Sequence, residues 1–539
     1  MKTASHLAAV AVAAALLVPS WPLRAQTLRT KESFDANWLF TKGDPADDHT
    51  QLTYAAVRPW LLPLQNPFTT NAPAAWPADN FGGDVSYAQP GFDDTNWRKL
   101  NLPHDFGIEG PFQQALPGDT AKLPWFGVAW YRKHFDLPPE DSGKEIFLDV
   151  DGAMAYSTVW INGHCVGGWP YGYASWQVDL TPYVKFGGAN TVAIRLDNPK
   201  NSSRWYPGGG IYRNVWLTKT FPIHVSHWGT YITTPVIGPA RAVVAVKTQV
   251  ENQSTNAADL NVETEIYELD RNGVKQGGIV ASQSAPLTLP AGTNLVSAAE
   301  LTIADPKLWN LDQPNRYLAV TTLRASGGDS SSPARTWDVV ENAFGIRTIE
   351  FTKTDGFLLN GKRVPINGVC DHHDLGALGS AINTRALDRQ LQILRGMGCN
   401  AIRTSHNPPA PELLELCDRL GLVVMDEAFD CWIEHKTPND YATIFNDWHE
   451  ADVRAYVRRD RNHPCVVLWS IGNEIDEQAH PHLFYIAQNL AAAVRREDAT
   501  RPITAACNHT EAGYNGFQHI VDVFGYNYKP WEYGKFRAA

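Results

Sequence analysis

The stretch VVLWSIGNE, residues 466–474, is an uninterrupted apolar run that ends in an amide and a carboxylate. Other short apolar runs occur on both sides of it, at 364–369, 400–403, 422–426, 502–506 and 521–526. Amphipathic segments with helical periodicity lie between them, at 384–397, 411–420, 445–461 and 483–496. Alternation of strands and helices is typical of a parallel sheet, so six successive units predict a (β/α)₈ (TIM) barrel.

The predicted barrel is incomplete. A barrel of this kind takes roughly 250 residues, whereas positions 346–539 supply 194. Only six of the eight strands can be recognised, so we expect strands one to six and a chain that stops about two strand–helix units early.

Two all-β domains are expected before the barrel. Residues 26–220 are rich in Trp, Gly and Pro, with short alternating runs at 146–150, 157–161, 191–196 and 215–217, and Asn162-Gly163 is a hairpin-turn signal. Residues 221–345 continue with alternating runs at 241–250, 260–267 and 317–323. The first region predicts a β-sandwich, and the second predicts a smaller, immunoglobulin-like sandwich. The predicted domain limits are therefore 26–220, 221–345 and 346–539.

The N-terminus has the features of a secretory signal. Lys2 precedes an apolar run at 7–18, and Pro19, Pro22 and the small residue Ala25 follow. Twelve apolar residues are too few to span a bilayer, which needs about 20. The pattern predicts a cleaved signal peptide at 1–25 and a periplasmic or secreted protein without a membrane anchor.

Composition excludes some partners and leaves others open. The formal net charge of -11 argues against a nucleic-acid or anionic-membrane partner. The seven cysteines include no C-x-x-C pair, so neither a disulfide framework nor a zinc site is expected. The 19 Trp and 19 Tyr fit either a sugar-binding surface or large β-sheet cores.

Catalytic residues of a barrel lie at the carboxyl ends of its strands. Five of the predicted strands end in polar side chains: Asp371, His372 and His373; Arg403, Ser405 and His406; Asp426, Glu427 and Asp430; Asn473 and Glu474; and Tyr526, Asn527 and Tyr528. Helix caps, solvated loops and structural ion pairs are the alternatives for several of them. Glu474 lies beside an amide and near Trp469 in sequence, which favours a raised pKa and the general-acid chemistry of a glycosidase.

Four stretches resemble glycoside hydrolase family 2. DRNHPCVVLWSIGNE (460–474) and NAIRTSHNPP (400–409) resemble two signatures of its barrel. SRWYPGGGIYRNVWL (203–217) resembles the end of its sugar-binding jelly roll, and FLLNGKRVPINGVCDHHD (357–374) resembles its barrel entry. The resemblance covers essentially the whole chain after the signal peptide, and within the family it is strongest to β-galactosidases.

The resemblance implies roles for seven residues. Glu474 would be the general acid/base, and Asn473 would contact the sugar 2-hydroxyl. Arg403 and Tyr528 would contact the nucleophilic carboxylate. Direct sugar contacts would come from three further residues: Asp197, His372 and His406.

The family is retaining, which requires a second carboxyl about 5–5.5 Å from the acid/base as nucleophile. In the family this Glu ends strand seven, so we expect it beyond residue 539. Glu532 is the only carboxylate after Tyr528, and it follows no apolar strand. We therefore do not assign Glu532 as the nucleophile.

These patterns predict a retaining exo-glycosidase that hydrolyses terminal β-D-galactosides and needs no cofactor. β-Glucuronidase and β-mannosidase activities are alternatives, as is a carbohydrate-binding chain without hydrolysis. Magnesium bound through Asp430, Glu434 and Glu474 is a further alternative. The expected partner is a small-molecule β-glycoside, and a homo-oligomer is left open.

Overall fold

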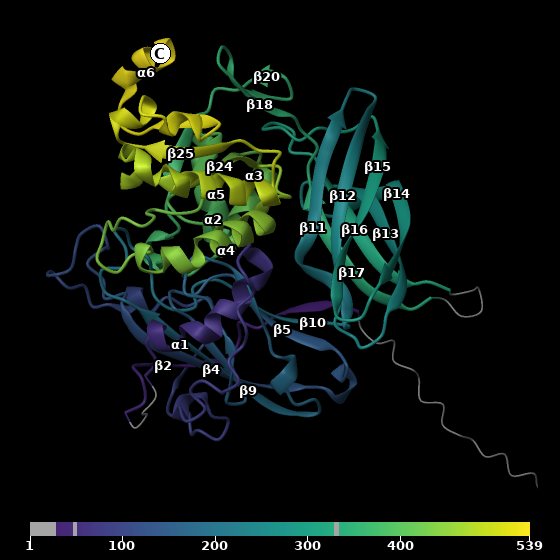
Figure 1. The fold of residues 1–539 in the computed structure, drawn as a ribbon, viewed down its shortest axis with the longest axis vertical. Helices are drawn as coiled ribbons and strands as arrows, with labels where there is room; N and C mark the ends of the chain where they lie inside the picture. The colour runs from purple at the N-terminus through teal and green to yellow at the C-terminus, as the bar shows by residue number, and fades with distance from the viewer. Residues whose placement is uncertain (1–27, 47–50, 328–333) are drawn as a thin grey trace, which may run out of the picture.

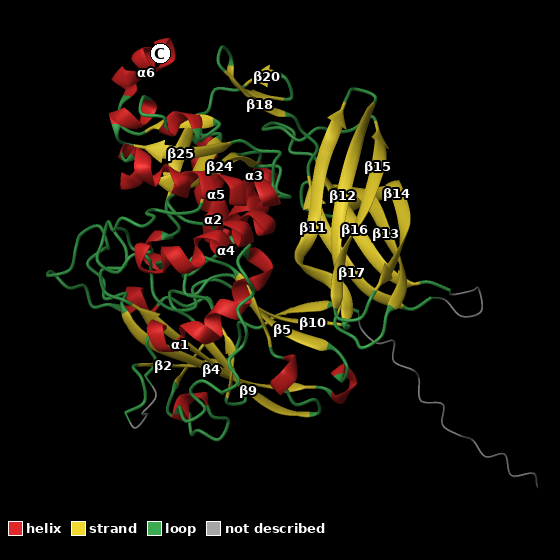
Figure 2. Ribbon diagram, in the orientation of Figure 1, coloured by secondary structure: helices red, strands yellow, loops and turns green. Residues whose placement is uncertain are grey.

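Two β-sandwiches and a partial parallel barrel make up the chain (Figure 1). The computed structural model describes residues 28–46, 51–327 and 334–539, so the predicted signal peptide at 1–25 lies outside the described residues. Helices are concentrated around the barrel sheet, and the two sandwiches consist mainly of strands (Figure 2). The predicted fold class, a jelly-roll sandwich, an immunoglobulin-like sandwich and an incomplete TIM barrel, is confirmed.

The first sandwich consists of a six-stranded sheet, in the order β3-β2-β4-β9-β6-β7, and a four-stranded sheet, in the order β1-β10-β5-β8. Its strands are β1 (Thr30–Ser33), β2 (Trp38–Lys42), β3 (Arg98–Leu100), β4 (Gly127–Leu137), β5 (Glu145–Val150), β6 (Thr158–Ile161), β7 (His164–Gly167), β8 (Trp176–Asp179), β9 (Gly188–Asn198) and β10 (Val215–Thr220). Trp38, Trp130 and Trp160 are fully buried. Trp38 packs against Phe34, whereas Trp130 and Trp160 stack on each other on the opposite face of the six-stranded sheet, where Tyr87 and Phe81 cover them. These three tryptophans therefore belong to the core of this domain and do not form a sugar-binding surface.

The Asn162-Gly163 signal was predictive, because both residues have positive φ (50° and 84°) in the turn between β6 and β7. Helix α1 (Tyr54–Leu61) in the same region was not predicted. Pro59 within the helix obscured its periodicity. Contacts with the barrel support it, since Arg58 Nη2 lies 2.6 Å from Asp447 Oδ1.

The second sandwich packs a three-stranded sheet, in the order β11-β12-β15, against a four-stranded sheet, in the order β14-β13-β16-β17. Its strands are β11 (Ile223–Ile237), β12 (Arg241–Asn252), β13 (Ala258–Leu269), β14 (Lys275–Leu289), β15 (Thr293–Ala304), β16 (Arg316–Ala325) and β17 (Thr336–Phe344). Burial alternates along β12, as the sequence pattern predicts for a strand with one face in a core. Val244, Val246, Ile266 and Leu301 are among the buried residues of that core.

The barrel sheet has six parallel strands in chain order, β21-β22-β23-β24-β25-β26. The strands are β21 (Gly368–Asp371), β22 (Ala401–Thr404), β23 (Val423–Glu427), β24 (Val466–Asn473), β25 (Ile503–Cys507) and β26 (Val523–Tyr526). The helices between them are α2 (Thr384–Gly396), α3 (Pro411–Leu420), α4 (Ala442–Asp460) and α5 (Phe484–Glu497), and α6 (Tyr533–Ala538) follows β26. β24 and β25 are buried along their whole length, which explains their continuous apolar sequences.

The bounds predicted for the first barrel strand, 364–369, are wrong, because β21 runs from Gly368 to Asp371. Residues just before it belong to a small antiparallel sheet of β18 (Ile349–Thr352), β19 (Gly356–Leu359) and β20 (Lys362–Arg363). Asn360 and Gly361 form its second turn, with φ of 53° and 73°. The dipeptide Asn-Gly was the signal for this hairpin, as it was at Asn162.

Loops of the first sandwich cover the barrel mouth. Trp169 Nε1 donates to Asp452 Oδ1 on α4 at 2.6 Å, and Tyr171 OH donates to the Ala428 carbonyl at 2.8 Å. Arg213 Nη2 donates to the Pro408 carbonyl at 2.9 Å. These buried contacts fix the sandwich against the ends of the barrel strands. No helix in the described part of the chain is long and apolar enough to cross a bilayer.

Asp452 should make the stability of this contact depend on pH. Burial raises its pKa to about 7, although hydrogen bonds from Tyr441 and Trp169 oppose the increase. An unfolded aspartate titrates near 3.9, so between about pH 4 and pH 7 only the folded state retains the proton. The stability that Asp452 contributes is therefore fully present below about pH 4 and is lost as the pH rises through 7.

Asp452→Asn should remove this component, which is on the order of a few kcal/mol. The thermal unfolding midpoint, measured from pH 4 to 8, should decline less with pH in the variant than in the parent protein. Asp447→Asn on the same helix is the control. A hydrogen bond from Arg58 lowers the pKa of Asp447, so that variant should keep the decline. An unchanged decline in Asp452→Asn would contradict the assignment.

Candidate active site

A fully buried carboxylate, Glu427, lies at the end of β23 and organises the rim of the barrel. Arg403 on β22 donates to both of its oxygens, with Nη2 at 2.9 Å from Oε1 and Nε at 3.1 Å from Oε2. His406 Nδ1 lies 2.7 Å from Oε1, and Ser470 Oγ donates to Oε2 at 2.6 Å. Side chains from three adjacent parallel strands or the loops that follow them thus meet at one carboxylate.

The surroundings keep Glu427 ionised. Burial alone would raise its pKa, but the charge of Arg403 and the hydrogen bonds from His406 and Ser470 outweigh that effect. The pKa of Glu427 is therefore below the usual glutamate value. A carboxylate with its oxygens engaged and no solvent exposure anchors other groups and is not accessible to a substrate.

Asn473 connects this ion pair to a second carboxylate. Its Oδ1 accepts from Arg403 Nη2 at 2.8 Å, and its Nδ2 donates to Asp430 Oδ1 at 2.8 Å. With both ends of the amide bonded, the Asn473 side chain has a fixed orientation. The bonds also assign its oxygen and nitrogen, since Arg403 can only donate and an ionised Asp430 can only accept.

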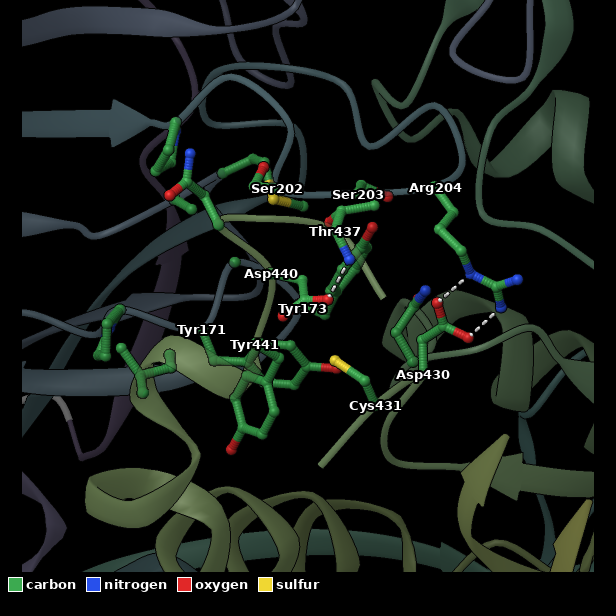
Figure 3. A pocket seen from close by; sticks show the side chains of 18 of the residues that line it. Tyr171, Tyr173, Ser202, Ser203, Arg204, Asp430, Cys431, Thr437, Asp440 and Tyr441 are labelled. Atoms are coloured by element: carbon green, nitrogen blue, oxygen red, sulfur yellow. Dashed lines mark hydrogen bonds and ion pairs between the residues drawn. The ribbon is translucent and has the colours of Figure 1, made fainter. Parts of the chain in front are cut away.

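Asp430 joins the first sandwich to the barrel. Arg204, from the loop between β9 and β10, donates to it twice, with distances of 3.0 Å to Oδ2 and 2.7 Å to Oδ1 (Figure 3). Lys436 Nζ approaches Asp430 Oδ1 at 3.1 Å. Although burial opposes ionisation, the bond from Arg204 and the charge of Lys436 hold the pKa of Asp430 well below its usual range.

Glu474 differs from these two carboxylates because it is partly exposed. Asn527 Nδ2 donates to Glu474 Oε1 at 2.8 Å, and the Tyr528 hydroxyl also bonds to the Glu474 carboxylate. That bond, together with burial and the negative charge of Glu474, raises the pKa of Tyr528. Both Glu474 and Tyr528 have positive φ, 47° and 62°. Non-glycine residues in this strained region are rare and cluster at functional sites.

Trp469 does not contribute to the environment of Glu474 in the way the sequence suggested. Its Nε1 donates to Asp498 Oδ2 at 2.9 Å, and its ring packs against Tyr456 and Arg501. Because successive strand residues alternate faces, proximity in sequence did not predict proximity of these side chains.

Two histidines and a tryptophan form an aromatic group next to the carboxylates. The ring centroids of Trp205 and His372 are 4.9 Å apart, and those of His372 and His406 are 5.5 Å apart. Burial and the nearby His406 lower the pKa of His372. A neutral imidazole can donate from one nitrogen and accept at the other, which suits contacts with sugar hydroxyls.

The structure brings together six of the seven predicted site residues: His372, Arg403, His406, Asn473, Glu474 and Tyr528. Within the described residues, no hydrogen bond or ion pair joins Asp197 to these six, so its predicted sugar contact stays a prediction. The Asp197 carboxylate pairs with Arg195 of its own strand at 3.2 Å. Tyr528 contacts Glu474, and its predicted contact with a nucleophile expected beyond residue 539 stays a prediction.

The proposed magnesium ligands do not fit a cation well. Asp430 already binds Arg204, Lys436 and Asn473 through its two oxygens. Within the described residues, one cluster has ligand atoms close enough to share an ion, namely Asp418, His463 and Cys465. Its two best ligands bond to each other, with 2.6 Å between His463 Nδ1 and Asp418 Oδ2.

Three residues of the site were not predicted: Arg204, Trp205 and Lys436. Asn527 was expected at the rim, but its bond to Glu474 was not predicted. Arg204 and Trp205 belong to SRWYPGGG, which the resemblance associated only with the jelly roll. The signal that could have found Arg204 is its charge, because a loop arginine next to a barrel rim rich in carboxylates is expected to pair with one of them.

Three family profiles match the chain. "Glycosyl hydrolases family 2, TIM barrel domain" matches residues 349–533. "Glycosyl hydrolases family 2" matches residues 223–347, and "Glycosyl hydrolase 2 galactose-binding domain-like" matches residues 111–205. The first profile matches the barrel, the second matches the second sandwich, and the third lies within the first sandwich.

Individual proteins agree with these profiles. Beta-galactosidase BoGH2A of Bacteroides ovatus is 44% identical in an alignment of 484 positions that covers 83% of this chain and 55% of the relative. A putative beta-glucuronidase of Formosa agariphila is 35% identical in an alignment of 439 positions that covers 80% of this chain and 39% of the relative. A crystal structure of a family 2 member from Bacteroides cellulosilyticus superposes with a TM-score of 0.79 at 35% identity, covering 94% of this chain and 59% of that one.

The chain thus spans about half the length of the relatives that it matches. Its two sandwiches, its barrel sheet and the order of all three agree with the matched profiles and with the superposed structure. The chain belongs to glycosyl hydrolase family 2.

Proposed function

We propose that the protein is a retaining exo-glycosidase that removes terminal β-D-galactosyl groups, with Glu474 as general acid/base. The observation that carries the proposal is the contrast among three carboxylates of one barrel rim. Glu427 and Asp430 are committed to arginine, whereas Glu474 is partly exposed and has two neutral partners, Asn527 and Tyr528. A carboxyl that exchanges protons with a glycosidic oxygen needs this accessibility.

The catalytic cycle would have two displacements. In the first, Glu474 donates its proton to the departing oxygen while a second carboxylate attacks the anomeric carbon. In the second, Glu474 takes a proton from a water molecule while the water oxygen bonds to the anomeric carbon, and the bond between that carbon and the second carboxylate breaks. Asn473, held by Arg403 and Asp430, presents an amide at a fixed position beside Glu474.

We further propose that the nucleophile is supplied by sequence beyond Ala539. Among the described residues, the two other carboxylates of the site, Glu427 and Asp430, are bonded to cationic groups, and Glu427 has no solvent exposure. Neither is free to form a bond to carbon. The greater length of the matched relatives supports a further segment of this kind.

The galactoside preference is supported by the 44% identical relative named beta-galactosidase. Beta-glucuronidases among the relatives support the alternative. Aryl β-galactoside, β-glucuronide and β-mannoside should be compared by kcat/KM. The galactoside should be hydrolysed fastest. A larger kcat/KM for either other sugar would assign that specificity, and binding of galactose without hydrolysis of any of the three would favour the carbohydrate-binding alternative.

Replacing Glu474 by Gln removes the exchangeable proton and preserves the shape of the side chain. We expect kcat for an aryl β-galactoside with a poor leaving group to fall about 10²–10⁴-fold. Substrates with a strongly acidic leaving group need less protonation and should retain more activity.

Asp476→Asn is the matched control, because this carboxylate is two residues away and more than half exposed. It should leave kcat nearly unchanged. Equal activity of Glu474→Gln and the parent protein on both substrates would exclude Glu474 as the acid/base.

Arg403→Met tests the anchoring role of the buried ion pair. The change leaves Glu427 buried without its guanidinium partner, and the free energy of unfolding should fall by about 3 kcal/mol. Urea denaturation measures the loss. Arg385→Met, whose side chain is 81% exposed, is the control and should change stability by less than about 0.5 kcal/mol. Equal stability of the two variants would contradict the anchoring role.

Export remains a proposal based on residues 1–25. N-terminal sequencing of the protein recovered from the producing cells tests it, and a mature N-terminus close to Gln26 is expected. An intact Met1 on the exported or periplasmic fraction would contradict cleavage.

A further inference from the structure

A polar cavity of about 490 Å³ lies between the second sandwich and the amino-terminal end of the barrel strands. In Figure 1 this sandwich stands beside the barrel, with β11 on the side that faces it. The cavity is lined by three arginines, four threonines and an asparagine, together with apolar residues and glycine. The polar lining residues are Thr233, Thr234, Arg347, Thr348, Arg461, Asn462, Thr500 and Arg501. No carboxylate is among the lining residues, although the chain as a whole has a net charge of -11.

Two of the guanidinium groups meet at one carbonyl oxygen. Arg347 Nη2 and Arg501 Nε both donate to the Val466 carbonyl, at 2.7 and 2.8 Å. Arg347 Nε donates to the Pro464 carbonyl at 2.5 Å, and within the described residues Arg347 forms no ion pair. Burial and the neighbouring Arg501 lower its pKa to about 9. Two like charges are therefore crowded together, and one of them has no counter-ion.

Arg461 has an unused donor. Its side chain is nine-tenths buried, and Nε has no hydrogen-bond partner. Nη1 bonds to Glu497, and Nη2 bonds to the Trp228 carbonyl. Glu497 does not neutralise this group fully, because it also receives Arg454 and Arg458. A buried cationic donor without a partner is costly, so native structures normally supply one.

Another nearby carboxylate, Asp498, is also committed. It pairs with Arg501 Nη1 at 2.6 Å and accepts hydrogen bonds from Tyr231, Trp469 and Thr500. Asp418, whose charge also acts on Arg347, bonds to His463 at 2.6 Å. Because Asp418 and Glu497 are shared with cationic groups outside the cavity, its three arginines are incompletely neutralised. Planar guanidinium groups together with threonine hydroxyls are donors that suit the oxygens of phosphate and sulfate.

We propose that this cavity binds a tetrahedral oxyanion, a phosphate or sulfate group, either free or as the ester of a small molecule. The anion would be held between Arg347, Arg461 and Arg501 and would contact the threonines of β11. It would bridge the second sandwich and the barrel, so binding should stabilise their contact. The cavity is lined by none of the residues of the candidate active site, and the proposal does not depend on glycosidase activity.

The test uses inorganic phosphate and sulfate with the whole protein. Thermal unfolding should be measured while either anion is titrated, with chloride at matched ionic strength as the reference. A saturable increase in the unfolding midpoint, absent with chloride, is expected. A change that follows ionic strength alone, without saturation, would overturn the proposal.

Thr234→Glu places a carboxylate in the cavity and leaves all three arginines intact, which guards against loss of the fold. Like-charge repulsion should weaken phosphate binding at least about tenfold. Thr302→Glu, on an exposed position of β15, is the matched control and should bind as the parent protein does. Unaltered binding by Thr234→Glu would place the anion elsewhere and overturn the proposal.

A final titration distinguishes a free phosphate or sulfate ion from a phosphate or sulfate ester as the ligand. Glucose 6-phosphate and glucose 6-sulfate should be titrated against the parent protein and Thr234→Glu. Tighter binding of an ester than of the free anion would assign the cavity to esters, and tighter binding of the free anion would assign it to inorganic phosphate or sulfate. Binding that Thr234→Glu does not weaken would again contradict the site.

Discussion

The buried ion pair between Arg403 and Glu427 is the constraint on which the candidate site depends. A charge without solvent exposure must be compensated locally, and here Arg403 and His406, from β22 and the loop after it, and Ser470, from β24, do so from either side of β23. Arg403 then has a remaining contact with Asn473 Oδ1. The orientation of that amide, next to Glu474, is thus a consequence of how one buried glutamate is neutralised.

The first sandwich extends the same network. Arg204 reaches from its β9–β10 loop to Asp430, and Asp430 accepts from the other end of Asn473. The Asn473 amide is therefore held at its oxygen by Arg403 of the barrel. At its nitrogen it is held by Asp430, which Arg204 of the sandwich stabilises. Buried bonds from Trp169 and Arg213 of the first sandwich to the barrel fix the two units against each other at the same end. Movement of the sandwich would alter the position of a residue beside the proposed acid/base.

Much of this could be predicted from the sequence. The apolar runs of β22 to β25 and the periodicity of α3 located the barrel, because buried parallel strands leave a continuous apolar signal. The signatures around Arg403 and Glu474 located the rim. Tertiary contacts were harder to foresee. Arg58, in the helix containing Pro59, pairs with Asp447 of the barrel, and the bond between Arg204 and Asp430 likewise joins residues from different domains. Asp197 was assigned from resemblance alone, and in the structure its carboxylate pairs with Arg195.

A crystal structure of the protein with galactose bound tests the central claim most directly. The account predicts that the sugar lies against Trp205 and His372, with the anomeric oxygen within hydrogen-bonding distance of the Glu474 carboxyl. Glu427 should remain bonded to Arg403 and make no contact with the sugar. Galactose bound with its anomeric oxygen at Glu427 or Asp430, or bound only on the sandwiches away from Glu474, would contradict it.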